Sequence, residues 1–122
     1  MTPKTQGQYE AEFTSAIIEM EKDFLGRGPT ETRTFFVDDM ILVRKRGILT
    51  PAQSKLAESP EGEALIKQTR RQLFETSRPL IDKIVHKILE CTVVSMHTDM
   101  SVSTNQRVLV LTVDINLDEF FS

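Results

Sequence analysis

Apolar residues in the first part of the chain recur at helical spacing. Between about Gln8 and Leu25 they form one stripe, and acidic and other polar residues fill the remaining positions. Gly26 is well suited to end this helix, because glycine adopts the left-handed conformation at low cost. The pattern predicts an amphipathic helix whose buried stripe consists of Tyr9, Phe13, Ala16, Ile17, Met20 and Phe24.

Two runs rich in β-branched and aromatic residues come next, at 32–37 and 40–44, and they flank Asp38-Asp39. A two-residue connection between two strands is a common length for a β-hairpin loop. Asp-Asp is weaker turn chemistry than Asp-Gly, although Asp tolerates a positive φ angle better than most residues. The resulting register predicts two facing pairs, Phe35 with Leu42 and Phe36 with Ile41.

Helical signals return in the middle of the chain. Thr50, Pro51 and Gln53 form a capping box with proline at the first helical position, which predicts a short helix. A longer helical pattern runs from 60 to 90, and Pro79 is predicted either to kink this helix or to start a new one. The candidate core positions of this stretch are Leu65, Ile66, Leu73, Leu80, Ile81, Ile84, Val85 and Ile88.

The last third of the chain predicts a second hairpin, with strands at 92–98 and 107–114 and a long polar loop at 99–106. The predicted order of elements is therefore α-β-β-α-α-β-β. This order is typical of an α+β fold with a four-stranded antiparallel sheet from two β-hairpins and helices packed on one face. We expect a single domain over 1–122, with a flexible N-terminus at 1–7 and a C-terminal tail at 115–122.

Composition narrows the possible functions. The chain has 122 residues, a net charge of −3, one cysteine and two histidines. This mild charge gives no field that attracts nucleic acid, and no apolar run reaches the roughly 18 residues of a membrane span. One cysteine and two histidines cannot build a Cys/His zinc site. We therefore expect a cytoplasmic protein without metal or cofactor, without nucleic-acid binding or direct membrane insertion, and with a buried, inert thiol at Cys91.

Two places are candidates for ligand chemistry. In Gly26-Arg27-Gly28-Pro29 the glycines let backbone amides converge and Arg27 adds a planar cation, so that an anion could bind; a helix stop followed by a turn explains the same residues. His97 and Asp99 lie two apart on a predicted strand, which places both on one face of the sheet. They could tune a base or hold an ion, or only form a structural hydrogen bond. No residue is predicted to be catalytic.

A short basic cluster lies on the first hairpin. Arg44, Lys45 and Arg46 are consecutive, and Arg33 faces them across the predicted turn. Acidic residues are interleaved throughout the chain, so a solvated charged face is favoured over a surface that binds nucleic acid.

Both faces of the predicted first hairpin are apolar. One layer of helices covers only one face of a sheet, and the other face would expose a large apolar patch unless something buries it. A two-fold homodimer is the simplest way to bury it. The apolar C-terminal tail could instead fold back or dock on a neighbour. The predicted interface residues are Phe35, Phe36, Met40, Ile41, Leu42, Phe120 and Phe121.

Several short motifs, taken in order, resemble a known bacterial family. They are Gly26-Arg27-Gly28-Pro29 after an acidic helix, Asp38-Asp39-Met40-Ile41, Gly47-Ile48-Leu49-Thr50-Pro51-Ala52, Glu61-Gly62 and His97-Thr98-Asp99 before a strand. Together they cover about 8–114 and resemble the MpsC-like family, which is named after a component of a sodium-translocating, membrane-potential-generating system. Gln53 departs from the acidic residue expected in the capping box.

The resemblance implies a small soluble bacterial protein that is sometimes associated with a membrane ion or bicarbonate transport system. It transfers no catalytic residue, and it points to Gly26–Pro29 and to the pair His97 and Asp99 as a functional surface. Three hypotheses follow. The first is a non-enzymatic accessory or regulatory module, homodimeric and bound to a protein partner such as a membrane transport subunit. The second is a small-anion or small-ligand binding protein that uses Gly26–Pro29 and nearby cations, and the third is an enzyme with His97 and Asp99 in its site.

Overall fold

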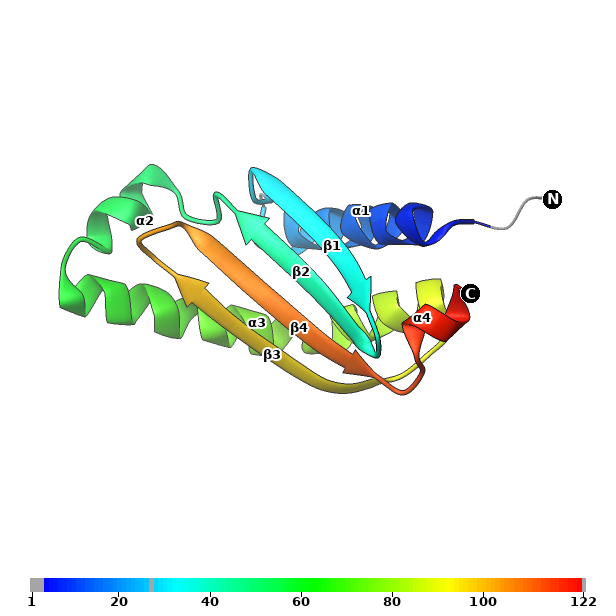
Figure 1. The fold of residues 1–122 in the computed structure, drawn as a ribbon. Coiled ribbons are helices and arrows are strands. Elements are labelled where there is room, and N and C mark those ends of the chain that lie inside the picture. Colours follow the sequence, from blue (N-terminus) through cyan, green and yellow to red (C-terminus); the bar gives the residue numbers. More distant parts are fainter. Residues whose placement is uncertain (1–3, 27, 122) are drawn as a thin grey trace.

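The computed structural model describes residues 4–26 and 28–121. It is an α+β fold in which the sheet forms one layer and the two long helices lie behind it (Figure 1). The predicted class and order of elements are confirmed, and the tail adds one short helix. The elements are α1 Gln6–Leu25, β1 Glu31–Val37, β2 Met40–Arg46, α2 Pro51–Leu56, α3 Pro60–Leu89, β3 Val93–Ser101, β4 Gln106–Val113 and α4 Leu117–Phe120.

The sheet is antiparallel throughout, and its strand order is β1-β2-β4-β3. The predicted register of the first hairpin is correct, since Phe35 lies opposite Leu42 and Phe36 opposite Ile41. The two hairpins join through β2 and β4, where Ile41 pairs with Leu111. This central pairing connects residues about 70 positions apart in the chain, so it places the two halves of the molecule in one layer.

The turn Asp38-Asp39 is held by the C-terminal segment. Asp38 has a φ of 58°, the left-handed value that a two-residue hairpin requires. The Asn116 side-chain amide donates to Asp38 Oδ1 at 2.7 Å, and the Leu117 N–H donates to the Asp38 carbonyl oxygen at 2.6 Å. Weak local turn chemistry is therefore reinforced by hydrogen bonds from a distant part of the chain.

The hydrophobic core lies between the sheet and the helices α1 and α3, as predicted. Alternate residues of each strand point to this side, and every fourth or third residue of the helices meets them. Ile41 and Leu111 are completely buried at the centre of the sheet. The largest fully buried side chains around them are Phe13, Ile17, Val43, Ile81, Val85, Leu89, Leu109 and Leu117.

The helices differ from the prediction in three details. α1 begins at Gln6 rather than near Gln8, because Thr5 forms a capping box that orders this part of the N-terminus. α3 continues through Pro79 as one 30-residue helix, so proline does not start a new helix there. Leu65, a predicted core position, is 53% exposed, and Phe74 is buried instead.

The second hairpin is more regular than predicted. Asp99 pairs with Val108 and Ser101 pairs with Gln106, so β3 extends to Ser101. The predicted loop at 99–106 is therefore wrong, and only residues 102–105 connect the strands. The sequence pattern predicts a loop here because these side chains are hydrophilic, whereas backbone pairing across an exposed face does not require apolar side chains.

Candidate functional site

The side of the sheet that faces away from the helices carries an apolar centre. We call this side the open face; Figure 1 looks onto it. Phe35 is 37% exposed and Val37 is 47% exposed, whereas their neighbours Thr34 and Phe36 are buried under helices. The other apolar residues of the open face are half-buried, and they are Met40, Leu42, Val108 and Val110. Contiguous exposed apolar residues of this kind commonly mark interaction sites.

Charged residues flank this apolar centre unequally. Arg33 on β1 lies opposite Arg44 on β2, so two like charges are neighbours at one edge of the sheet. The Arg33 guanidinium lies 5.1 Å from the centre of the Phe35 ring, a cation–π contact. In the same row Arg44 pairs with Val108, and Val108 pairs with Asp99 on β3. The open face is therefore basic on the β1–β2 side and carries a carboxylate on the β3 side.

His97 and Asp99 lie where the sequence predicts, on one face of β3, and both are exposed on the open face. His97 is opposite Val110, and Asp99 Oδ1 accepts a hydrogen bond from the Met100 N–H at 2.8 Å. Within the described ranges there is no group of three or more His, Cys, Asp or Glu side chains that could hold a metal ion. The pair thus borders the apolar centre.

The segment after α1 ends the helix as predicted. Gly26 has a φ of 80°, and its N–H donates to the Lys22 carbonyl oxygen at 2.9 Å. Gly28 and Pro29 are half-buried between this helix end and β1. Arg27, which the sequence hypothesis assigned as the cation of an anion site, lies outside the described residues.

The predicted interface residues separate into two groups. Phe35, Met40 and Leu42 lie on the open face, but Phe36 and Ile41 are 3% and 0% exposed in the chain's own core. Their placement in an interface is therefore wrong for this fold. The reason is the two-residue side-chain period of a strand, which sends neighbouring residues to opposite faces.

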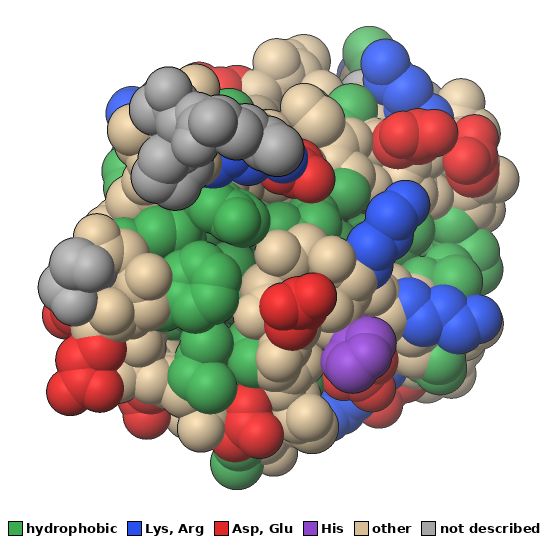
Figure 2. Space-filling model, turned by 90° about the vertical axis from the view of Figure 1, so that its right-hand side faces the viewer, with side chains coloured by type: hydrophobic (Ala, Val, Ile, Leu, Met, Phe, Trp, Pro, Cys, Tyr) green, Lys and Arg blue, Asp and Glu red, His purple; other side chains and the backbone are tan. Residues whose placement is uncertain are grey.

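The C-terminal tail folds back on its own chain. Phe121 stacks on Phe36 with 5.7 Å between ring centres and lies 5.2 Å from the Tyr9 ring. Phe120 also contacts Tyr9, at 5.8 Å, and remains 43% exposed. Figure 2 shows apolar side chains gathered over this end of the molecule, with charged groups around them. The tail therefore covers part of the core, which is one of the two roles considered for it.

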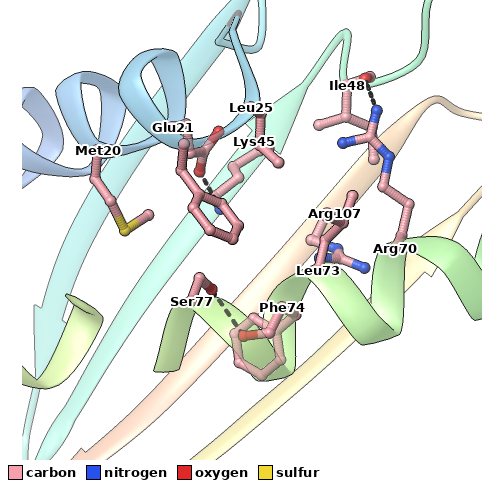
Figure 3. Close-up of a pocket in the computed structure, with 11 residues that line it drawn as sticks. Met20, Glu21, Leu25, Lys45, Ile48, Arg70, Leu73, Phe74, Ser77 and Arg107 are labelled. Carbon is pink, nitrogen blue, oxygen red and sulfur yellow. Dashed lines mark hydrogen bonds and ion pairs between the residues drawn. The ribbon is translucent and has the colours of Figure 1, made fainter. Parts of the chain in front are cut away.

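A charged cavity on the helix-covered side was not found by sequence reasoning. It has a volume of about 40 Å³ and lies between α1, α3 and the strands β2 and β4 (Figure 3). Glu21 and Lys45 form an ion pair there and are only 6% and 7% exposed. Arg70 Nη2 donates to the Ile48 carbonyl oxygen at 2.6 Å, and the Arg107 guanidinium lies 5.9 Å from the centre of the Phe74 ring.

Burial controls the electrostatics of this cavity. It lowers the pKa of Lys45, and the Glu21 carboxylate acts in the opposite direction without cancelling the effect. Burial also lowers the pKa of Arg107, and the nearby Arg70 cation lowers it further, whereas the Glu21 and Asp99 carboxylates oppose the shift. Arg70 therefore disfavours the charged forms of both Lys45 and Arg107.

The spacing of buried positions along the sequence indicates the charged residues of this cavity. Glu21 continues the buried helical positions Phe13 and Ile17 at a spacing of four. Lys45 continues the inward strand positions Ile41 and Val43, and Arg107 continues those of Leu109 and Leu111 in the same way. A charged residue in phase with a buried stripe is a candidate for a paired buried charge. The consecutive run Arg44, Lys45 and Arg46 therefore does not form one solvated face.

A wide groove runs along the outer surface between α1 and α3. Its volume is about 700 Å³, and Met20, Leu80, Ile84 and Ile88 are among its apolar lining residues. Acidic side chains line it on the α1 side and lysines line it on the α3 side; they are Glu12, Glu19, Asp23, Lys83 and Lys87. The groove thus has an apolar floor, an acidic rim on α1 and a basic rim on α3.

Comparison with known proteins gives a consistent result. The sequence of residues 5–115 matches the family described as "Na+-translocating membrane potential-generating system (MpsC)". The chain is 43% identical over 107 residues to the uncharacterized protein YbcI of Bacillus subtilis (strain 168), a match that covers 88% of this chain and 86% of YbcI.

A second relative from the same organism is the uncharacterized protein YrhF, which is 25% identical over 112 residues and is matched over 88% of this chain and 89% of its own length. No solved structure matches the chain. In the part of the chain that the structure describes, no helix is both long and apolar enough to cross a membrane. The family match covers nearly the whole chain, and this chain belongs to the MpsC family.

Proposed function

We propose that this chain is a cytoplasmic, non-enzymatic accessory module that dimerises through its open face and serves a sodium-translocating membrane system. The observation that carries the proposal is the apolar centre of the open face, with Phe35 and Val37 exposed. An exposed apolar patch rimmed by charge is characteristic of a protein–protein interface. The family description supports the link to a membrane system.

The second copy is the occupant that best fits the open face. A two-fold axis parallel to the strands, midway between β2 and β4, would place each β1 over the partner's β3. Leu42 would then meet Val110, because these residues occupy one row of the sheet. Arg33 would meet Asp99, which lies in its own row at the opposite edge. The unequal charges of the face therefore become complementary when it packs against itself.

Distance favours this arrangement. Packed sheets are separated by about 10 Å, which a long arginine side chain and a carboxylate can bridge together. The exposed Arg33 and the half-buried Arg44 would each gain an acidic or apolar neighbour beside their like-charged one. Self-association thus resolves both features of the face, its exposed apolar area and its adjacent like charges.

Dimerisation through the open face leaves the groove between α1 and α3 accessible. An amphipathic helix fits such a groove, with its apolar stripe on Ile84 and Ile88. Lysine or arginine on one edge of that helix would face Glu19, and acidic residues on the other edge would face Lys83. We assign this groove to a cytoplasmic segment of the membrane partner.

Light scattering after gel filtration tests the dimer. We expect the wild-type chain at micromolar concentration to have about twice the 13.9 kDa mass of one chain. Leu42→Glu should give monomers, because it places two carboxylates in the centre of the interface. Leu65→Glu is the matched control, since Leu65 is 53% exposed on α3, and it should leave the mass unchanged. A monomeric wild-type chain would refute the proposal.

Charge reversal tests the orientation of the two copies. Arg33→Asp and Asp99→Arg should each weaken the dimer, and the double variant should restore it, because the pair is exchanged across the two-fold axis. If the double variant dimerises no better than the single ones, the face is used in another arrangement.

The membrane partner requires a separate experiment. A tagged chain should recover an identified subunit of a sodium-translocating complex from bacterial membranes. Ile84→Asp should abolish the recovery by charging the floor of the groove, whereas Leu65→Asp should not. Recovery that is the same for wild type and Ile84→Asp would remove the groove from the proposal.

A further inference from the structure

We infer that the outer edge of β1 binds an extended segment of a partner protein, with small side chains and a central carboxylate, as an additional strand of the sheet. The strand order β1-β2-β4-β3 leaves β1 at one edge (Figure 1). This edge lies in the plane of the sheet, so it differs from the open face and from the groove between α1 and α3. The inference does not depend on the proposed dimer, although the two surfaces share Arg33.

The backbone of β1 points outward at every second residue. The Phe36 N–H donates to Glu10 Oε2 at 2.7 Å, and the Phe36 carbonyl oxygen accepts from Gln6 Nε2 at 3.0 Å. Both partners belong to α1, so the N–H and C=O of Phe36 face away from β2. Because this direction alternates along an edge strand, the N–H and C=O groups of Thr34 and Thr32 face outward as well.

Side chains of α1 occupy the edge at Phe36 and leave it open at Thr32 and Thr34. Among the hydrogen bonds of the described residues, none reaches the outward backbone groups of these two threonines. The Thr34 hydroxyl accepts from the Thr14 hydroxyl of α1 at 2.7 Å, whereas the Thr32 hydroxyl is buried without a partner in the described part of the chain. The open edge therefore offers N–H and C=O groups at the spacing that an antiparallel strand requires.

A groove of about 410 Å³ follows this open part of the edge. Apart from Glu10, the α1 residues that line it have small side chains, and they are Gly7, Ala11, Thr14 and Ser15. The space above the helix is unfilled at Gly7, where a Cβ atom would meet only Thr5 Oγ1, at 3.9 Å. In strand addition, backbone hydrogen bonds supply affinity and the spaces for alternate side chains supply specificity. This groove therefore fits a strand whose helix-facing side chains are small.

Charge selects the residue between those small side chains. Arg33 is exposed and lies between Thr32 and Thr34. Side chains directly opposite each other on neighbouring strands are in contact, so an acidic residue facing Arg33 is stabilising and a basic one is destabilising. A second copy fits this edge poorly, because two-fold pairing of Thr32 with Thr34 would place the two Arg33 side chains opposite each other. The guanidinium has five N–H donors, so the peptide carboxylate and Asp99 of a second copy can both bind it.

NMR titration of the whole chain with the peptide acetyl-Val-Ala-Glu-Ala-Lys-amide tests this edge. In antiparallel pairing, the two alanines bond to Thr34 and Thr32, and the glutamate lies opposite Arg33. We expect saturable shifts of the Thr32 and Thr34 amide signals, and slower hydrogen exchange of both N–H groups at saturation. Replacing the glutamate of the peptide by lysine should weaken binding by about fivefold, the size of a cross-strand charge effect.

N-methylated peptides show whether the backbone is paired. A methyl group on the nitrogen of the first alanine removes the N–H that donates to Thr34, and it should weaken binding at least about tenfold. A methyl group on the glutamate nitrogen is the matched control, because that N–H points away from β1. It should change the affinity by less than about twofold.

A pair of chain variants tests the groove. Ala11→Leu fills it and should abolish binding, whereas Ala52→Leu makes the same change at an exposed position of α2 and should leave the affinity unchanged. The N-methylated peptides act on the wild-type chain, so they test the inference even if Ala11→Leu does not fold.

Three outcomes would overturn the inference. The first is the absence of saturable shifts at Thr32 and Thr34. The second is the same affinity for the two N-methylated peptides. The third is a set of shifts at these threonines that grow with chain concentration in the absence of peptide, which would assign the edge to a second copy. Light scattering measures the open-face dimer separately, so failure of one proposal is distinguishable from failure of the other.

Discussion

The two faces of the sheet are made from alternate residues of the same strands, yet they meet opposite environments. On β2, Ile41 is completely buried beneath α1 and α3, while its neighbour Leu42 is half-buried on the open face. Both side chains are large, aliphatic and central in the sheet. The difference in burial comes only from the direction of the side chain, so a one-residue change in register would exchange the two environments.

Each face of the sheet carries residues that are usually found in the opposite environment. The covered face buries Glu21 and Lys45 at one end of the core, and the open face leaves Phe35 and Val37 in contact with solvent. A protein that acted as an isolated monomer would gain from the opposite distribution. The exposed Phe35 and Val37 lie where we propose that a second copy packs, whereas Glu21 and Lys45 compensate each other's charge inside the core.

The largest effect that we expect is a difference in the free energy of unfolding between core substitutions and open-face substitutions. Ile41→Ala should lower the free energy of unfolding by about 3–4 kcal/mol, because it leaves a cavity in a packed core. Leu42→Ala should cost less than about 1 kcal/mol in the monomer. Urea unfolding at low and high protein concentration measures both. A dimer through the open face should make the cost of Leu42→Ala rise with concentration, and equal costs for the two variants at low concentration would contradict the comparison.

The buried ion pair gives the next largest effect. Glu21→Gln should destabilise the chain by about 3 kcal/mol, because Lys45 is left among two arginines without its carboxylate. Glu31→Gln acts on an exposed pair with Arg46 at 3.9 Å and should cost less than about 0.5 kcal/mol.

Replacing both Glu21 and Lys45 by leucine should recover most of the lost stability, because the desolvation of two charges is removed together. Urea unfolding of the single and double variants measures this coupling. A double variant as unstable as Glu21→Gln would mean that packing, rather than charge, sets the cost.

Cys91 allows a smaller effect to be measured through pH. The thiol is 4% exposed, and burial raises its pKa from 9.0 to about 11, with a smaller contribution from the Asp114 carboxylate. The folded chain therefore keeps a proton that the unfolded chain releases between pH 9 and 11. The free energy of unfolding should fall across this window, by about 2–3 kcal/mol at its upper end.

The difference in the free energy of unfolding between wild type and Cys91→Ala isolates the thiol's contribution from that of other groups that titrate at alkaline pH.

Thiol labelling compares the accessibility of the covered side of the sheet with that of the open face. Native Cys91 should react slowly at pH 8, whereas Val37→Cys in the Cys91→Ala background should react readily, because Val37 is 47% exposed. Rapid labelling of native Cys91 would show that the covered side opens.

Local patterns in the chain were sufficient for much of the fold. The periodicity of 8–25 and 60–90 predicted both long helices, and the runs on either side of Asp38-Asp39 predicted the hairpin and its register. The capping box at Thr50 and Gln53 is present as predicted. These features are predictable because helix caps, two-residue turns and side-chain alternation depend on residues close together in the chain.

The charged cavity was not predictable in the same way. Glu21, Lys45, Arg70 and Arg107 come from four elements, and they meet only because β2 pairs with β4 and both helices cross the same face. The sequence hypothesis for an anion used Gly26–Pro29, which are adjacent in the chain, and that assignment remains a prediction. His97 and Asp99 likewise remain a predicted functional pair, now located at the edge of the open face.

The sequence by itself determined the fold class, the order of the two long helices and the two hairpins, and the alternation of buried and exposed positions along the first hairpin. It also indicated that the sheet has two apolar faces, of which one layer of helices can cover only one. The tertiary structure alone decided which of the two apolar surfaces is covered, that Phe121 packs on Phe36, and that Glu21, Lys45, Arg70 and Arg107 line one cavity. The physical reason is the range over which each interaction acts along the chain. Backbone geometry and capping act over a few residues, whereas burial and electrostatic pairing depend on distances in space between residues that the chain order does not relate.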